Sequence, residues 1–146
     1  MRPEPRIIAA RLAVLLVDDD EAYRFSLAVL LEDEIGVEVD VASTYDEATQ
    51  KLEEAGNKYA LVLLDQMLGS HPGQTLVPLV RERAPAARIM VVSGAEPSRA
   101  VEEAVDGVVL KTLAIPRLLE AISRQLEVRE SATIALQNPT PGGPTR

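Results

Sequence analysis

The sequence contains no cysteine and no tryptophan, and it has only one phenylalanine and three tyrosines among 146 residues. The lack of cysteine excludes disulfide bonds, thiolate metal sites and cysteine-dependent catalysis. Apolar residues nevertheless make up 47% of the chain, so the core must be built from valine, leucine, isoleucine and alanine. Aliphatic cores of this kind are typical of parallel sheets that are covered by helices on both faces.

Positive charge is also scarce, because 15 lysines and arginines face 23 aspartates and glutamates and leave a net charge of −8. Binding to nucleic acid requires a basic surface, so we expect neither nucleic acid nor an anionic membrane as a partner. Long hydrophobic runs are absent, and the longest are far shorter than the ~20 residues that cross a bilayer. Since no signal-peptide pattern is present either, we expect a soluble protein located in the cytoplasm.

Five short aliphatic runs alternate with segments of helical periodicity. The runs cover residues 12–17, 37–41, 59–64, 89–92 and 107–110. Their length and abrupt polar ends are typical of buried strands. Asp20 is placed to cap the helix after the first run. We expect the apolar face of that helix to comprise Ala22, Phe25, Val29 and Leu30.

The alternation of strands and helices predicts an α/β fold with a doubly wound, five-stranded parallel sheet and helices on both faces. We expect this single domain to span residues 11–130. Residues 1–10 are interpreted as a leader. Residues 131–146, where proline and glycine cluster, are interpreted as a disordered tail or a truncated linker.

Polar side chains stand where the predicted strands end. Asp18 and Asp19 follow the first strand, Asp65 the third, Ser93 the fourth and Lys111 the fifth. In an open α/β sheet, ligands bind at the carboxyl ends of the strands, so we expect these groups to meet there. Clustered carboxylates repel unless a cation lies among them, and Mg²⁺ prefers oxygen ligands. A carboxylate can also act as a nucleophile toward phosphorus.

Four segments resemble the motifs of the response-regulator receiver family of two-component systems. They are residues 15–20, 61–65, 89–95 and 109–111, and the resemblance extends from Leu12 to Val128. It implies a flavodoxin-like receiver fold, related to chemotaxis regulators. It also implies a signalling domain that takes up and loses a phosphoryl group, rather than a turnover enzyme.

The resemblance also implies residue roles. Asp65 matches the phosphoacceptor, while Ser93 and Lys111 match the residues that contact phosphoryl oxygens. Asp18, Asp19, Asp65 and the backbone carbonyl of Met67 match the ligands of Mg²⁺. Gly73 and Leu76 match residues that start the helix after the phosphorylation loop. The implied partners are a sensor histidine kinase or phosphotransfer protein and an unknown downstream protein, and we expect a monomer or weak homodimer.

The chain departs from the family pattern at several points. Thr112 follows Lys111 at a position where the family usually has proline. In the family, the peptide bond before that proline is cis, and a cis bond before a non-proline residue costs roughly 2.5–4 kcal/mol. Gly69 replaces a usual proline, which predicts a looser loop. Val108 replaces an aromatic switch residue, and the segment between Ser93 and Lys111 is short, which predicts a trimmed fourth helix. We therefore expect an altered relay of the signal.

Two alternatives remain open from the sequence. One is a pseudo-receiver that binds partners without control by phosphorylation, which these departures would suit. The other is a haloacid-dehalogenase-like phosphatase in which Asp18 is the nucleophile and Asp20 the general acid. Ala22 and Ser93 do not fit the pattern of that second family. His71, the only histidine, is interpreted as an exposed loop residue without a catalytic role.

Overall fold

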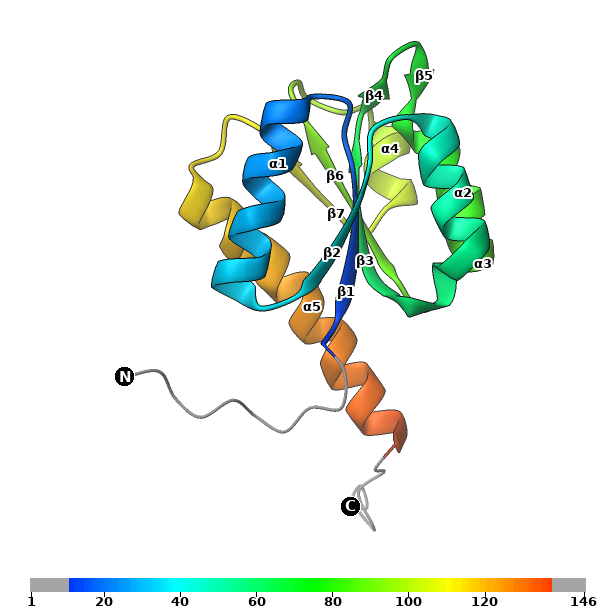
Figure 1. Ribbon diagram of the computed structural model, residues 1–146, viewed down its shortest axis with the longest axis vertical. Coiled ribbons are helices and arrows are strands. Elements are labelled where there is room, and N and C mark those ends of the chain that lie inside the picture. The colour runs from blue at the N-terminus through cyan, green and yellow to red at the C-terminus, as the bar shows by residue number, and fades with distance from the viewer. Residues whose placement is uncertain (1–10, 138–146) are drawn as a thin grey trace.

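Figure 1 shows the computed structural model, which describes residues 11–137. The main sheet contains β1 (Ala13–Val17), β2 (Glu38–Ala42), β3 (Tyr59–Asp65), β6 (Arg88–Ser93) and β7 (Gly107–Leu110). The helices are α1 (Glu21–Leu30), α2 (Tyr45–Ala55), α3 (Val77–Arg83), α4 (Arg99–Ala104) and α5 (Ile115–Gln137). Shorter elements are a π-helical turn (Leu31–Ile35), two 3₁₀ turns (Gly56–Lys58 and Gly73–Leu76) and a small hairpin, β4 (Met67–Leu68) with β5 (His71–Pro72).

The sheet has the order β2-β1-β3-β6-β7, and every pair of neighbours in it is parallel. This arrangement confirms the predicted doubly wound α/β fold. The strand order reverses between β1 and β3. From β1 the chain continues to β2 at one edge of the sheet, whereas from β3 it continues to β6 and β7 toward the opposite edge. Ligand sites in such sheets lie at the carboxyl ends of the strands at this switch point.

Helices cover both faces of the sheet, with α1 and α5 on one side and α2, α3 and α4 on the other (Figure 1). Successive strand residues point to opposite faces, and both faces are buried here. In β1, for example, Leu15 joins the core beneath α2, while Leu16 joins the core that contains Leu27 of α1 and Ile122 of α5. The aliphatic composition therefore serves two separate layers of packing.

The expected apolar face of α1 was wrong. Phe25 is 70% exposed and Val29 is 38% exposed, whereas Leu27 and Leu31 are buried against the sheet. Both pairs are spaced four residues apart, so both form a stripe along one side of a helix. The side that packs is fixed by the direction in which the chain leaves β1, which periodicity does not reveal.

The last helix extends further than the expected domain end. The expected boundary lies at residue 130, whereas α5 continues to Gln137. The reason is local, because residues 131–137 contain neither glycine nor proline, and the first proline follows at position 139. The expected leader at 1–10 and the remainder of the expected tail, 138–146, lie outside the described residues. Within residues 11–137, no helix combines the length and apolarity needed to cross a membrane.

Candidate functional site

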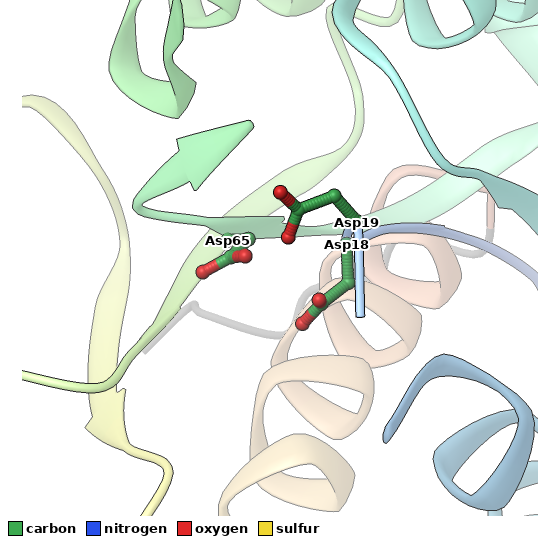
Figure 2. Close-up of side chains that lie close together, drawn as sticks. All are labelled: Asp18, Asp19 and Asp65. Atoms are coloured by element: carbon green, nitrogen blue, oxygen red, sulfur yellow. The ribbon is translucent and has the colours of Figure 1, made fainter. Parts of the chain in front are cut away.

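Three carboxylates meet at the carboxyl edge of the sheet. Asp65 is the last residue of β3, and Asp18 follows the last residue of β1, which pairs with β3 through Val17 and Leu64. One carboxylate oxygen each from Asp18, Asp19 and Asp65 lies within 4.8 Å of the others, and Figure 2 shows their grouping. Asp18 is 1% exposed and Asp65 is 9% exposed, while Asp19 is open to solvent. The predicted acidic cluster is therefore present in the fold.

Lys111 brings the positive charge into this cluster. Its backbone nitrogen donates a hydrogen bond to the carbonyl of Ser93, which fixes the residue at the end of β7. Its Nζ atom lies 2.9 Å from Oδ2 of Asp18 and 3.6 Å from Oδ1 of Asp65. One ammonium thus serves two buried carboxylates, which leaves the group of four side chains short of positive charge.

This shortage affects the acidity of the site. Burial, and then the negative charge of Asp18, raise the pKa of Asp65 to about 6, although the Lys111 ammonium opposes that rise. For Lys111, burial disfavours the charged form, but the hydrogen bond and charge of Asp18 outweigh burial and raise the lysine pKa. The repulsion around Asp65 is the kind that a bound cation relieves.

The donor set fits a divalent cation that prefers oxygen ligands. Three carboxylate oxygens that lie within 4.8 Å of one another supply hard, negatively charged ligand atoms. One of the three residues, Asp19, is exposed and leaves the cluster open toward solvent. Met67, the expected fourth ligand, begins β4 two residues after Asp65, and the role of its carbonyl stays a prediction.

Ser93 lies beside Asp65 at the same edge. Val92 is the register partner of Asp65 in the pairing of β6 with β3, so Ser93 stands one residue further along. Its buried hydroxyl contacts the side-chain oxygen of Gln66 and the carbonyl oxygen of Ala95. A hydroxyl has one proton and can donate to only one of these acceptors. Any further oxygen that enters the site must therefore compete for the Ser93 hydroxyl.

The loop after Asp65 folds into a hairpin rather than staying irregular. β4 and β5 pair antiparallel, Met67 with Pro72 and Leu68 with His71, around a turn at Gly69 and Ser70. Gly69 has a φ of +63°, as glycine has at the first central position of type II′ hairpin turns. Its backbone nitrogen donates to Oδ2 of Asp19 over 3.1 Å. The glycine that we expected to loosen this loop thus forms its turn.

Two further loop residues have structural partners. His71 is exposed, as expected, and its ring stacks on Tyr45 at the start of α2 with a centroid separation of 4.9 Å. Gly73 donates its backbone N–H to the carbonyl of Gln66. A Cβ atom on Gly73 would overlap the backbone carbonyl oxygen of Asp65. Glycine is therefore required at position 73 by close packing against the residue at the centre of the cluster.

The departures around Lys111 do not displace its side chain. Among the described residues no peptide bond is cis, so the bond before Thr112 is trans, and Lys111 still reaches both carboxylates. Val108 is partly buried and packs on the core layer that contains Val101 of α4. The fourth helix is only six residues long, and it lies in the short segment between Ser93 and Lys111.

Sequence reasoning missed three residues at the site. The ring of Tyr23 lies against the ammonium of Lys111, Arg24 donates through Nη1 to the carbonyl of Asp18 over 2.8 Å, and Gln66 contacts Ser93. Tyr23 and Arg24 lie on the first turn of α1, which directly follows the acidic motif. This closeness in the sequence is the one feature that could have placed them at the site. Asp20 faces away from these roles, since its side chain caps α1 by accepting from the backbone nitrogen of Tyr23.

Comparisons with known proteins agree on the nature of this fold. The model of the response regulator receiver domain family matches residues 14–123. A CheY-like receiver domain protein from Methanospirillum hungatei is 29% identical over 84% of this chain and 99% of its own, with a TM-score of 0.74. No curated protein sequence matches significantly.

Two other solved structures are similar and contain ligands. A response regulator from Burkholderia pseudomallei, with a phosphorylated aspartic acid, a calcium ion and citrate, is 29% identical over 88% of this chain and 76% of its own, with a TM-score of 0.67. The response regulator TrrA from Thermotoga maritima, in complex with Mg²⁺ and BeF, is 27% identical over 78% of this chain and 98% of its own, with a TM-score of 0.68.

The match to the family model begins at Val14 within β1 and includes the rest of that strand, the other four strands of the main sheet and all the residues of the acidic cluster. Asp20 is engaged as a helix cap, so the phosphatase alternative, which needs it as a general acid, does not fit. Fold, strand order and site agree with the same assignment. This chain belongs to the response regulator receiver domain family.

Proposed function

We propose that Asp65 accepts a phosphoryl group from a sensor histidine kinase or a phosphotransfer protein in a Mg²⁺-dependent reaction, and that its phosphorylation controls a contact with another protein. The observation that carries this proposal is the convergence of three carboxylates and one ammonium at the sheet edge, with Lys111 Nζ 3.6 Å from Asp65. A chain that undergoes this cycle is a signalling module rather than a turnover enzyme.

In the proposed transfer, a carboxylate oxygen of Asp65 attacks the phosphorus atom of the donor's phosphohistidine. An oxygen–phosphorus bond forms, the phosphorus–nitrogen bond breaks, and the imidazole nitrogen of the donor takes up a proton. Asp65 must be ionised to attack. Its raised pKa of about 6 still leaves the carboxylate the main form at neutral pH, and the ammonium of Lys111 favours that form.

Asp18, Asp19 and Asp65 would hold the metal ion, together with the carbonyl of Met67. When bound, Mg²⁺ supplies positive charge to the phosphoryl oxygens and to the crowded carboxylates. The similar proteins from Thermotoga and Burkholderia, one with Mg²⁺ and BeF and one with calcium and a phosphorylated aspartic acid, support a site of this kind at Asp65.

Lys111 and Ser93 would bind the oxygens of the transferred group. The lysine supplies charge from one side, and the serine hydroxyl supplies a hydrogen bond from the neighbouring strand. Ser93 must then turn its proton away from Gln66 and Ala95, which it contacts now. Ser93 ends β6, and the short loop before α4 follows it directly. A rearrangement of the Ser93 hydroxyl would therefore affect this loop and α4 first.

The test is the intact mass of the protein after incubation with acetyl phosphate and Mg²⁺. We expect one phosphoryl group on the parent protein and none on Asp65→Asn or in the presence of EDTA. If the parent gains no phosphoryl group and its NMR spectrum does not change when beryllofluoride is added, the pseudo-receiver alternative would replace this proposal.

A further inference from the structure

Lys111 has a third neighbour besides its two carboxylates. Its Nζ atom lies 4.6 Å from the centroid of the Tyr23 ring, within the ~6 Å at which an ammonium is attracted to the face of an aromatic ring. Tyr23 belongs to α1 and packs against the core layer between that helix and the sheet. The ring therefore approaches Lys111 from a different element than either Asp18 or Asp65.

The other two contacts of the Lys111 ammonium change during the proposed reaction. Asp18 and Asp65 would both become ligands of the metal ion, and Asp65 would also carry the phosphoryl group. The ammonium then has to leave Asp18 and reach the phosphoryl oxygens. The Tyr23 ring binds no metal, so its attraction for the ammonium persists through both states.

The lysine side chain needs such a guide. Its backbone is fixed by the hydrogen bond to Ser93, but its side chain is 23% exposed and is held here by the two carboxylates that the metal ion would engage. A lysine has four rotatable side-chain bonds and loses rotamer freedom when it is held in one place. A fixed aromatic face that covers the ammonium reduces the number of positions that it can take while its carboxylate partners are engaged elsewhere.

The ring of Tyr23, rather than its hydroxyl, makes this contact. The Tyr23 oxygen is buried and has no hydrogen-bond partner among residues 11–137, and a buried hydroxyl without a partner is unfavourable. Phenylalanine would therefore provide the same aromatic face without the unpaired oxygen. Leucine would fill a similar space without an aromatic face.

We propose that Tyr23 is a positioning residue for phosphoryl transfer, whose ring holds the Lys111 ammonium beside Asp65 when Asp18 and Asp65 bind other groups. This role rests on the proposed function. It does not make Tyr23 a catalytic residue, because the ring touches neither Asp65 nor the transferred group in this account and acts only through Lys111.

The test compares initial rates of phosphorylation by acetyl phosphate with saturating Mg²⁺ in the parent, Tyr23→Phe, Tyr23→Leu, Lys111→Met and the double variant Tyr23→Leu with Lys111→Met. We expect Tyr23→Phe to stay within about twofold of the parent and Tyr23→Leu to fall about three- to tenfold. In the Lys111→Met background, Tyr23→Leu should have no further effect, because the cation that it serves is gone.

Three results would overturn this role. One is an unchanged rate in Tyr23→Leu. Another is an equal loss in Tyr23→Phe and Tyr23→Leu, which would assign the effect to the hydroxyl. The third is an undiminished effect of Tyr23→Leu in the Lys111→Met background, which would show a packing role alone. Thermal unfolding of each variant confirms that the compared proteins are folded.

Proton NMR of the protein without phosphoryl donor separates this inference from the proposed function. The ring current of Tyr23 should shift the ε-methylene protons of Lys111 upfield in the parent and in Tyr23→Phe, and the shift should vanish in Tyr23→Leu. Unchanged ε-methylene shifts in Tyr23→Leu would overturn the role of Tyr23 alone. A parent protein that takes up no phosphoryl group would overturn the proposed function, and this role with it.

Discussion

The ammonium of Lys111 lies closer to Asp18, at 2.9 Å, than to Asp65, at 3.6 Å. In this state the lysine therefore neutralises a carboxylate that we assign to the metal ion. Lysine and cation compete for the same negative charge, and this competition leads to the first prediction.

Replacement of Lys111 by methionine should tighten the binding of Mg²⁺ while it slows phosphoryl transfer. The ammonium is within about 4 Å of two of the three carboxylates, where charges in a partly solvated site interact appreciably. We expect an affinity about three- to tenfold higher, measured by titration of backbone amide shifts with Mg²⁺. Weaker binding in Lys111→Met would contradict the competition between lysine and metal.

Replacement by asparagine of Asp19 or of its neighbour Asp20 should have different effects on Mg²⁺ affinity, because only Asp19 is assigned to the metal ion. Asp19 contributes an oxygen to the carboxylate cluster, whereas Asp20 accepts a hydrogen bond from the helix start. Asp19→Asn should weaken Mg²⁺ binding by about tenfold or more. Asp20→Asn removes the same charge but keeps a good cap, so its affinity should stay within about twofold. Equal losses in the two variants would mean that only net charge matters.

The raised pKa of Asp65 predicts a pH-dependent penalty on folding when no divalent cation is present. Between its ordinary pKa of 3.8 and about 6, the folded state keeps a proton that the unfolded chain has lost. Stability contributed by that proton is present below this window and is lost as the pH rises through it.

Asp65→Asn should remove this penalty. In EDTA at about pH 8 it should unfold in urea with a free energy on the order of 2 kcal/mol higher than the parent, and the gain should shrink toward about pH 4. Addition of Mg²⁺ at the higher pH should reduce the difference by stabilising the parent. A gain that does not depend on pH would argue that the carboxylate is not strained by its surroundings.

Two glycines near the site should respond very differently to alanine. A Cβ atom at position 73 would overlap the backbone of Asp65, whereas one at Gly94 meets no atom within 4 Å. Gly73→Ala should therefore lower the free energy of unfolding by about 2 kcal/mol or more and reduce phosphorylation, because Asp65 must move. Gly94→Ala should change stability by no more than about 0.5 kcal/mol. Similar stabilities of the two variants would contradict the packing described here.

Much of this fold and site follows from the sequence because strands end where their apolar runs end. Asp18, Asp65, Ser93 and Lys111 each close such a run, and parallel pairing then brings the ends to one edge. The helix cap at Asp20 is equally local, since a carboxylate three residues before a free backbone N–H can accept its hydrogen bond. These predictions needed no knowledge of which strand lies beside which.

Contacts between distant segments could not be obtained in this way. The stripes of Phe25 and Val29 and of Leu27 and Leu31 are equivalent along the sequence, and only the path of the chain between β1 and the sheet surface decides which one is buried. The contact of Tyr23 with Lys111 joins residues that lie far apart in the sequence. The hairpin turn at Gly69 depends on a positive φ, which the proline that is usual in the family at this position would not adopt.

The central claim is that Asp65, and no other carboxylate of the cluster, carries the phosphoryl group. Borohydride reduces an aspartyl phosphate to homoserine, so treatment of the phosphorylated protein followed by peptide mass spectrometry locates the modified residue. We predict homoserine at position 65 alone, and none after incubation with EDTA. Homoserine at Asp18 or Asp19, or an unmodified Asp65 in protein that carries a phosphoryl group, would contradict the account.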